Sequence, residues 1–206
     1  QTSSIGYLIS KDTRDNFFNP KSGSRFLANT TFAGVGGDAR FIKLESKYKN
    51  YTPFSYGDYV LSLAGNAGVI TSVDDEKITS SNRFYFNSRS VRGFDRYGIG
   101  PRDTGNDDIV GGNNYYSGTV ELRTKKFTPD DSGIEWSIFS DFGSLWDTDY
   151  PTNVKGIKDS SPRVSAGVSV YWTTPIGPLN FTWGWPVQEE DYDKDNNFRF
   201  SIGTSF

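Results

Sequence analysis

The sequence predicts an all-β, antiparallel transmembrane β-barrel of about eight or nine strands. Three observations support this fold class. Apolar and polar residues alternate with a period of two along most of the chain. Aromatic residues make up 16% of the 206 residues, although apolar residues reach only 34%. Short turns alternate with long polar loops, which is the arrangement of outer-membrane barrels.

The first part of the chain contains four strand candidates, at 5–10, 24–32, 40–51 and 59–69. The first is a short apolar run that precedes a Pro/Gly turn. The alternation is sharpest in the third, where apolar Ile42, Leu44 and Tyr48 oppose charged Lys43, Glu45, Lys47 and Lys49. A strand with this pattern presents one apolar face and one polar face.

The alternation returns in five later segments, at 116–123, 134–143, 164–172, 179–185 and 197–206. Most candidates approach the ~9–11 residues that a tilted strand needs to cross a bilayer, and no segment with a helical period competes. Bacterial single-chain barrels usually have an even number of strands. We therefore expect either that segment 5–10 is a partial strand or that eight strands close.

The two strand faces distinguish a membrane barrel from a soluble one. The non-aromatic face carries Ser, Asn, Gly, Thr or charged residues, which suits a wet lumen. Aromatic residues cluster at strand ends, as in an interfacial girdle: Trp146, Trp172, Trp183, Trp185 and Phe206. A soluble lipocalin-like barrel is the alternative, but it needs the apolar face inside.

Composition excludes several functions. The net charge is −3 without a basic tract, so nucleic acid is not an expected partner. The chain has no Cys and no His, which removes thiolate ligands, the usual general base and the commonest metal ligand. The acidic run 189–195 lacks the glycine and final Glu of an EF-hand, so we expect a solvated loop. We expect no enzyme activity, no cofactor and no metal.

We expect residues 1–206 to form a single transmembrane domain. No apolar run approaches the ~18 residues of a membrane-spanning helix. The first four residues lack the basic and apolar regions of a signal peptide, and the chain does not begin with Met. The sequence is therefore interpreted as a mature or excised fragment.

A long polar segment, about 71–114, separates the two strand-rich regions. Loops of about 40 residues without periodicity are usually functional or disordered. Near its middle lie Val91, Arg92, Gly93 and Phe94, a single arginine flanked by small and aromatic residues. An ordinary surface loop is the alternative interpretation of these four residues.

Strand parity places two acids, Glu121 and Asp141, on the inner face, with Glu135 nearer a strand end. An arginine carried inward by the loop could form charge-assisted, bidentate bonds with such a carboxylate. Breaking a desolvated pair of this kind costs about 3–5 kcal/mol, because one charge is left unpaired. The alternative is that both acids simply line a water-filled channel.

Several short motifs follow one another along nearly the whole chain. They are DTRDNFFNP at 12–20 with Gly23, VRGF at 91–94, GGN at 111–113, SDFG at 140–143 with WD at 146–147, SAG at 165–167, PIGPL at 175–179 and the terminal segment 198–206. In this order they resemble the barrel of the BamA family of outer-membrane insertases, which carries the bacterial surface antigen domain.

The resemblance implies a loop that folds into the lumen, where Arg92 would contact Asp141 and Glu121. The last strand would act as an assembly signal and as one side of a lateral seam, through Phe198, Phe200, Ile202, Gly203 and Phe206. The implied function is insertion of β-barrel proteins into the outer membrane of a Gram-negative bacterium. The implied partners are the lipid bilayer, unfolded client proteins and the accessory assembly lipoproteins of the full-length family.

The chain also departs from the family pattern. Family barrels have sixteen strands and upstream POTRA domains, so this chain resembles the C-terminal half of the barrel. A half sheet has two unpaired edges, which lipid does not tolerate. We therefore expect a smaller closed barrel, self-association with a second copy, or a place in a longer chain. The alternative functions are a pore of the two-partner-secretion or porin type, or a truncated barrel without activity of its own.

Overall fold

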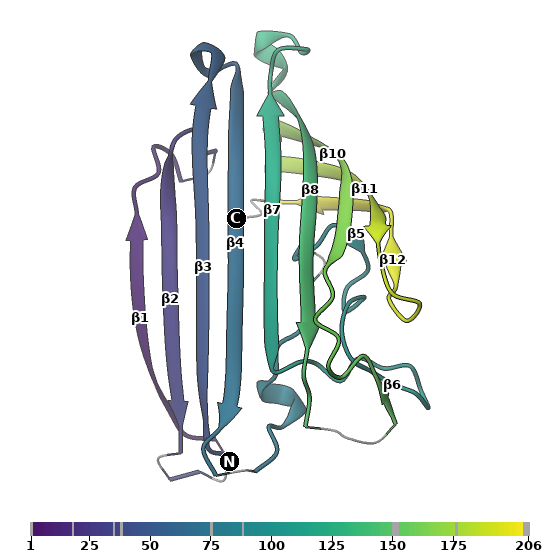
Figure 1. Ribbon diagram of the computed structural model, residues 1–206. Helices are drawn as coiled ribbons and strands as arrows, with labels where there is room; N and C mark the ends of the chain where they lie inside the picture. The colour runs from purple at the N-terminus through teal and green to yellow at the C-terminus, as the bar shows by residue number, and fades with distance from the viewer. Residues whose placement is uncertain are drawn as a thin grey trace.

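A single antiparallel sheet of nine strands, in the order β1-β2-β3-β4-β7-β8-β10-β11-β13, dominates the computed structural model (Figure 1). The structure describes residues 2–17, 19–34, 36–37, 39–74, 76–87, 89–149, 153–175 and 177–203. The nine strands are β1 (Ser4–Asp12), β2 (Gly23–Ala33), β3 (Phe41–Phe54), β4 (Tyr59–Ser72), β7 (Asn114–Thr124), β8 (Ile134–Trp146), β10 (Arg163–Thr174), β11 (Gly177–Gln188) and β13 (Phe198–Ile202). The predicted all-β, antiparallel fold class is confirmed.

Four shorter strands lie in the loops and form two small sheets. Strand β5 (Gly93–Phe94) pairs with β12 (Asp195–Asn196), and β6 (Arg102–Asp103) pairs with β9 (Val154–Lys155). Three short 3-10 turns complete the elements: η1 (Ser55–Gly57), η2 (Ser80–Asn82) and η3 (Asp130–Ser132). No helix in the described residues is long and apolar enough to span a membrane.

The two ends of the sheet differ in their connections (Figure 1). The turns between β3 and β4 and between β7 and β8 lie at one end, here called the turn end. The long connections from β4 to β7 and from β8 to β10 leave from the other end, here called the loop end.

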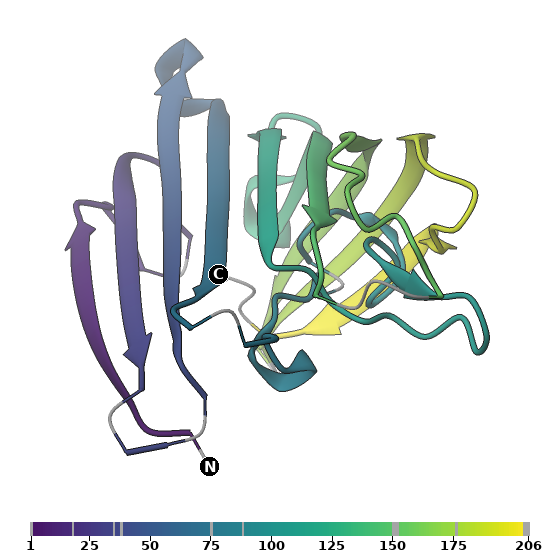
Figure 2. The ribbon, with the colours of Figure 1, turned by 60° about the horizontal axis from the view of Figure 1, so that its bottom comes forward.

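Two expectations about closure are wrong. The first strand is complete, since β1 pairs with β2 along all of Ser4–Asp12. The strands also do not close as a ring of eight: in the described residues β1 and β13 are the two edges of an open sheet, and only β7 to β13 curve round the loop (Figure 2). An eight-stranded barrel has room only for its own inward side chains. Here the inner face holds a folded loop, which requires a wider lumen.

The faces of the sheet show the predicted polarity. On the outer face Ile138 is 60% exposed and Val120 is 46% exposed, whereas the inward Asp141 is 0% exposed. Trp172 and Trp185 are also exposed on the outer face, and Phe206 lies outside the described residues. A soluble barrel needs the opposite arrangement, with its apolar face inside. The sheet therefore matches a wall between lipid and a polar lumen.

The loop between β4 and β7 brings its own hydrophobic core to the loop end of the sheet. This core combines residues of the loop with residues from the ends of the strands: Ala33, Phe41, Ile70, Ile78, Phe84, Phe86, Val91, Phe94, Ile99, Tyr115 and Leu145. Arg102 is 3% exposed and donates from Nη1 to the carbonyl oxygen of Asp107 at 3.0 Å. The described part of the loop is thus a packed element whose position is fixed by buried contacts.

Candidate functional site

The Arg92 side chain reaches from the loop to the inner face of the sheet. Its Nε donates to Oδ2 of Asp141 at 2.7 Å, and its Nη2 donates to Oδ1 of the same carboxylate at 2.9 Å. The backbone N–H of Arg92 donates to Asp141 Oδ2 as well, at 2.9 Å. Nη1 lies 3.4 Å from Oε1 of Glu121. The structure therefore brings Arg92 together with both of the acids that parity places on the inner face.

Two aromatic residues of the inner face complete this cluster. The guanidinium carbon of Arg92 lies 3.5 Å from the centroid of the Phe139 ring, and the hydroxyl of Tyr171 donates to Glu121 Oε1 at 2.8 Å. Sequence reasoning did not assign either residue to the site. The available signal was the alternation of inward and outward residues, because Phe139 is an aromatic residue between Ser137 and Asp141 on the inner face of its strand.

Electrostatics favour a charged Arg92. Burial opposes the charge, but the hydrogen bonds of Asp141 and the charge of Glu121 outweigh burial, so the pKa of Arg92 lies above its usual value. Both acids are buried as well, with Glu121 6% exposed and Asp141 0% exposed. Charged groups in such surroundings are stable only as a pair, so each member of the cluster depends on the others.

The backbone of the VRGF segment needs its glycine. Gly93 has φ 93°, a left-handed conformation that L side chains rarely adopt. A Cβ at Gly93 would lie 3.2 Å from the carbonyl carbon of Gly184 and 3.2 Å from Cβ of Ser165. Val91 and Phe94 on either side are 2% and 1% exposed in the loop core. The segment thus lies directly against β11, which brings Arg92 within reach of Asp141.

We expect Gly93→Ala to weaken this contact. The substitution adds strain of about 1–3 kcal/mol for an αL-type position and crowds the backbone of Gly184. The expected result is faster protease cleavage of the loop in the folded protein, measured by mass spectrometry. Gly36→Ala is the control, because Gly36 also has positive φ but a Cβ there meets nothing within 4 Å. Equal protection of the loop in the two variants would contradict the close approach.

A second buried ion cluster ties together the connections at the loop end. Arg163, 0% exposed, donates from Nε to Asp193 Oδ2 at 2.8 Å and from Nη2 to Asp159 Oδ2 at 3.0 Å. The Tyr192 hydroxyl also donates to Asp159. Burial tends to raise the pKa of Asp159, but the hydrogen bond from Tyr192 and other hydrogen bonds lower it to about 2.

The expectation of a solvated loop at 189–195 is wrong for Asp193, whose side chain is 0% exposed. A buried arginine attracts this carboxylate out of water. The same loop contacts the VRGF segment, because β12 pairs with β5 and the Asp95 N–H donates to the Lys194 carbonyl oxygen at 2.8 Å. The second cluster therefore holds the turn against which the VRGF segment is paired.

The last strand, β13, is an edge of the sheet. It pairs with β11 on one side and has no partner strand on the other within the described residues. Three of its residues are exposed on the outer face: Phe198, Phe200 and Ile202. Gly203 follows and donates its N–H to the Pro178 carbonyl oxygen at 2.8 Å, whereas Phe206 lies outside the described residues.

The fold and the site together define the wall of a membrane β-barrel whose loop enters the lumen, where Arg92 contacts Asp141 and Glu121. The chain matches the Omp85 superfamily domain over residues 1–206. It belongs to the Omp85 superfamily.

Its relatives include bacterial and eukaryotic proteins. The chain is 31% identical over 204 residues to outer membrane protein assembly factor BamA of Neorickettsia risticii, covering 99% of this chain and 27% of that protein. It is 29% identical over 213 residues to a SAM50-like protein of Schizosaccharomyces pombe, covering 98% and 44%. The crystal structure of BamA from Haemophilus ducreyi lacking POTRA domains 1-3 superimposes with a TM-score of 0.88 at 23% identity, covering 98% and 42% of the two chains. The chain thus spans less than half the length of these relatives.

Proposed function

We propose that this chain forms part of an insertase barrel in the outer membrane of a Gram-negative bacterium. In this role it assists unfolded β-barrel clients to enter the bilayer without covalent chemistry. The observation that carries the proposal is the Arg92 cluster, which holds a folded loop against the inner face of an open sheet. The BamA relatives, which are named as outer-membrane protein assembly factors, support the same role.

The proposal gives the inner acids and the edge strand β13 different roles. Asp141 and Glu121 hold Arg92, so the loop stays inside while the edge strand β13 remains available for pairing. An unpaired strand edge presents a row of N–H and C=O groups that can bind another strand. Client strands would pair along this edge at the seam formed by Phe198, Phe200, Ile202, Gly203 and Phe206. We also propose accessory assembly lipoproteins as partners of the full-length protein, and self-association of this chain with a second copy.

Client insertion in vesicles tests the proposal. An unfolded eight-stranded client is added to lipid vesicles with or without the folded chain, and folding is followed by the gel shift between boiled and unboiled samples. We expect faster folding with the chain, and a loss of that acceleration in Arg92→Ala. Vesicles that conduct ions without accelerating folding would favour a translocation or porin-type pore. Neither acceleration nor conductance would indicate a truncated barrel without activity of its own.

A further inference from the structure

The seam strand β13 pairs with the rest of the sheet over a short stretch. It is paired with β11 only at residues 179–183, whereas β11 pairs with β10 along nearly all of Gly177–Gln188. Within the described residues no strand pairs with the other side of β13. Segments with few contacts open most readily, so any further contact of β13 matters for its stability.

The residues directly before β13 are attached to the VRGF segment. Strand β12 (Asp195–Asn196) pairs with β5 (Gly93–Phe94), and both lie beside β11 (Figure 1). The Asp95 N–H donates to the Lys194 carbonyl oxygen at 2.8 Å, and the Lys194 N–H donates to the Gly98 carbonyl oxygen at 3.0 Å. The chain therefore enters β13 from a point that is fixed on the loop.

Arg199 extends this attachment into the seam strand itself. It is the second residue of β13 and lies on the inner face, whereas Phe198 and Phe200 on either side of it point outward. Its Nη2 donates to the carbonyl oxygen of Phe94 at 2.9 Å. Phe94 is 1% exposed in the loop core, so buried contacts hold the residue that supplies the acceptor.

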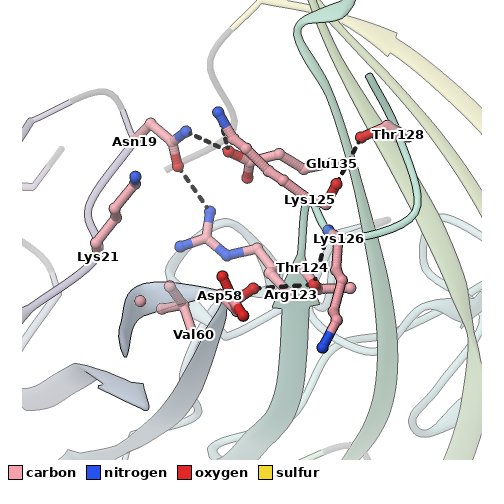
Figure 3. A pocket seen from close by; sticks show the side chains of 11 residues that line it. Asn19, Lys21, Asp58, Val60, Arg123, Thr124, Lys125, Lys126, Thr128 and Glu135 are labelled. Atoms are coloured by element: carbon pink, nitrogen blue, oxygen red, sulfur yellow. Dashed lines mark hydrogen bonds and ion pairs between the residues drawn. The ribbon is translucent and has the colours of Figure 1, made fainter. Parts of the chain in front are cut away.

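An inward arginine also holds a connection at the turn end of the sheet. Arg123 on β7 donates from Nη1 to Asn19 Oδ1 at 3.1 Å (Figure 3), and from Nη2 to the Pro20 carbonyl oxygen at 2.6 Å. These bonds fasten the connection between β1 and β2 to the inner face. Arg199 differs because it lies on an edge strand, so its bond to the loop acts on a strand that is paired on one side only.

The contacts form a continuous series from the wall of the lumen to the seam. Asp141 binds Arg92, the VRGF backbone carries the Phe94 carbonyl oxygen, and this oxygen accepts the bond from Arg199. We propose that Arg199 is a positioning residue that makes the stability of the seam strand depend on the docked VRGF segment. While the segment is bound to Asp141, β13 is held against β11. When the segment leaves, β13 loses this support.

The coupling deepens the proposed insertase role, and its last step rests on that role. A client strand needs an edge with free N–H and C=O groups. Displacement of the loop would let β13 separate from β11 and offer such an edge, and return of the loop would restore the pairing. The position of the loop would thus decide when the seam accepts a client.

A double-mutant cycle followed by hydrogen exchange of β13 tests the coupling. The full-length protein is studied in nonionic detergent micelles, and exchange of residues 198–202 is compared with exchange of β3 in the same molecule. Arg199→Gln should speed the exchange of β13 about tenfold relative to β3, because it removes a charge-assisted hydrogen bond. Arg92→Ala should speed it at least as much. The double variant should match Arg92→Ala alone, since both changes break the same series of contacts.

The matched control is Arg123→Gln, which removes an inward arginine whose hydrogen bonds go to the connection between β1 and β2. It should leave the exchange of β13 unchanged. The gel shift between boiled and unboiled samples verifies folding, and Arg92→Lys replaces Arg92→Ala in the cycle if the alanine variant does not fold.

Two results would overturn the proposal. One is unchanged exchange of β13 in Arg199→Gln. The other is that the effects of the two single changes multiply in the double variant, because Arg199 would then act only as an inward charge on an edge strand. Client folding is not measured in this experiment, so the coupling can fail while the insertase role stands, and the insertase role can fail while the coupling stands.

Discussion

Arg92→Ala is expected to lower the free energy of unfolding by about 3–5 kcal/mol, because it leaves buried carboxylates without their cation. Asp141 is 0% exposed and accepts two side-chain hydrogen bonds from Arg92. Glu121 keeps its hydrogen bond from Tyr171 but loses the nearby guanidinium. Guanidinium titration of the folded protein in micelles, followed by tryptophan fluorescence, measures the change.

Two matched variants show whether the effect belongs to the contact itself. Arg89→Ala removes an exposed arginine from the same loop and should change stability by no more than about 0.5 kcal/mol. Arg92→Lys keeps the charge but not the planar pair of donors, so an intermediate loss is expected. If Arg92→Ala were as mild as Arg89→Ala, the cluster would not hold the loop.

Arg163→Met is expected to have a comparable effect at the loop end, again about 3–5 kcal/mol. Methionine fills much of the space but leaves Asp193, with 0% side-chain exposure, without its partner. The 189–197 connection should then separate from β10, and its pairing with the VRGF segment should weaken. Hydrogen exchange of the Asp95 amide, which donates to the Lys194 carbonyl oxygen, reports this second consequence.

Lys155→Met provides the comparison, because Lys155 is an exposed cation in the neighbouring loop strand β9. It should leave both the unfolding free energy and the Asp95 exchange rate nearly unchanged. An Arg163 variant that loses stability but keeps Asp95 protected would show that the second cluster does not support the VRGF segment.

Two sets of contacts hold the VRGF segment. Asp141 binds its arginine from the sheet, while β12, positioned through Asp193 and Arg163, pairs with its Gly93 and Phe94. The strands that flank the loop, β4 and β7, pair directly with each other. The loop therefore takes no part in the main sheet, and these contacts keep it folded. The arrangement explains how a long connection can be ordered within a polar lumen.

The alternation of residues was sufficient to predict the strands and their inner and outer faces, because the residues of each strand alone determine which side chains share a face. A period of two places Glu121 and Asp141 inward and Val120 and Ile138 outward, whatever the neighbouring strands are. The same rule places Phe139 inward, but it does not say that a guanidinium will lie on the ring. That contact depends on where the loop enters the lumen.

Contacts between loops could not be predicted from the sequence. The pairing of β5 with β12 joins two residues to two others about 100 positions away, and neither pair has a strand pattern of its own. The burial of Asp193 also depends on a contact between distant segments. An acidic run is usually solvated, and here the buried Arg163 binds the Asp193 carboxylate. The open sheet agrees with the resemblance to one half of a sixteen-stranded barrel. The alternation within each strand does not by itself say whether nine strands close into a ring.

The central claim is that Arg92 holds the loop against the inner face of the sheet, and hydrogen exchange of the Arg92 backbone amide tests it most directly. This N–H donates to Asp141 Oδ2 at 2.9 Å. We predict strong protection of the amide in the folded chain, lost in Asp141→Ala, which removes the acceptor, while the amides of β7 and β8 remain protected. Exchange of the Arg92 amide at the rate of an open loop in the unsubstituted protein would contradict the account.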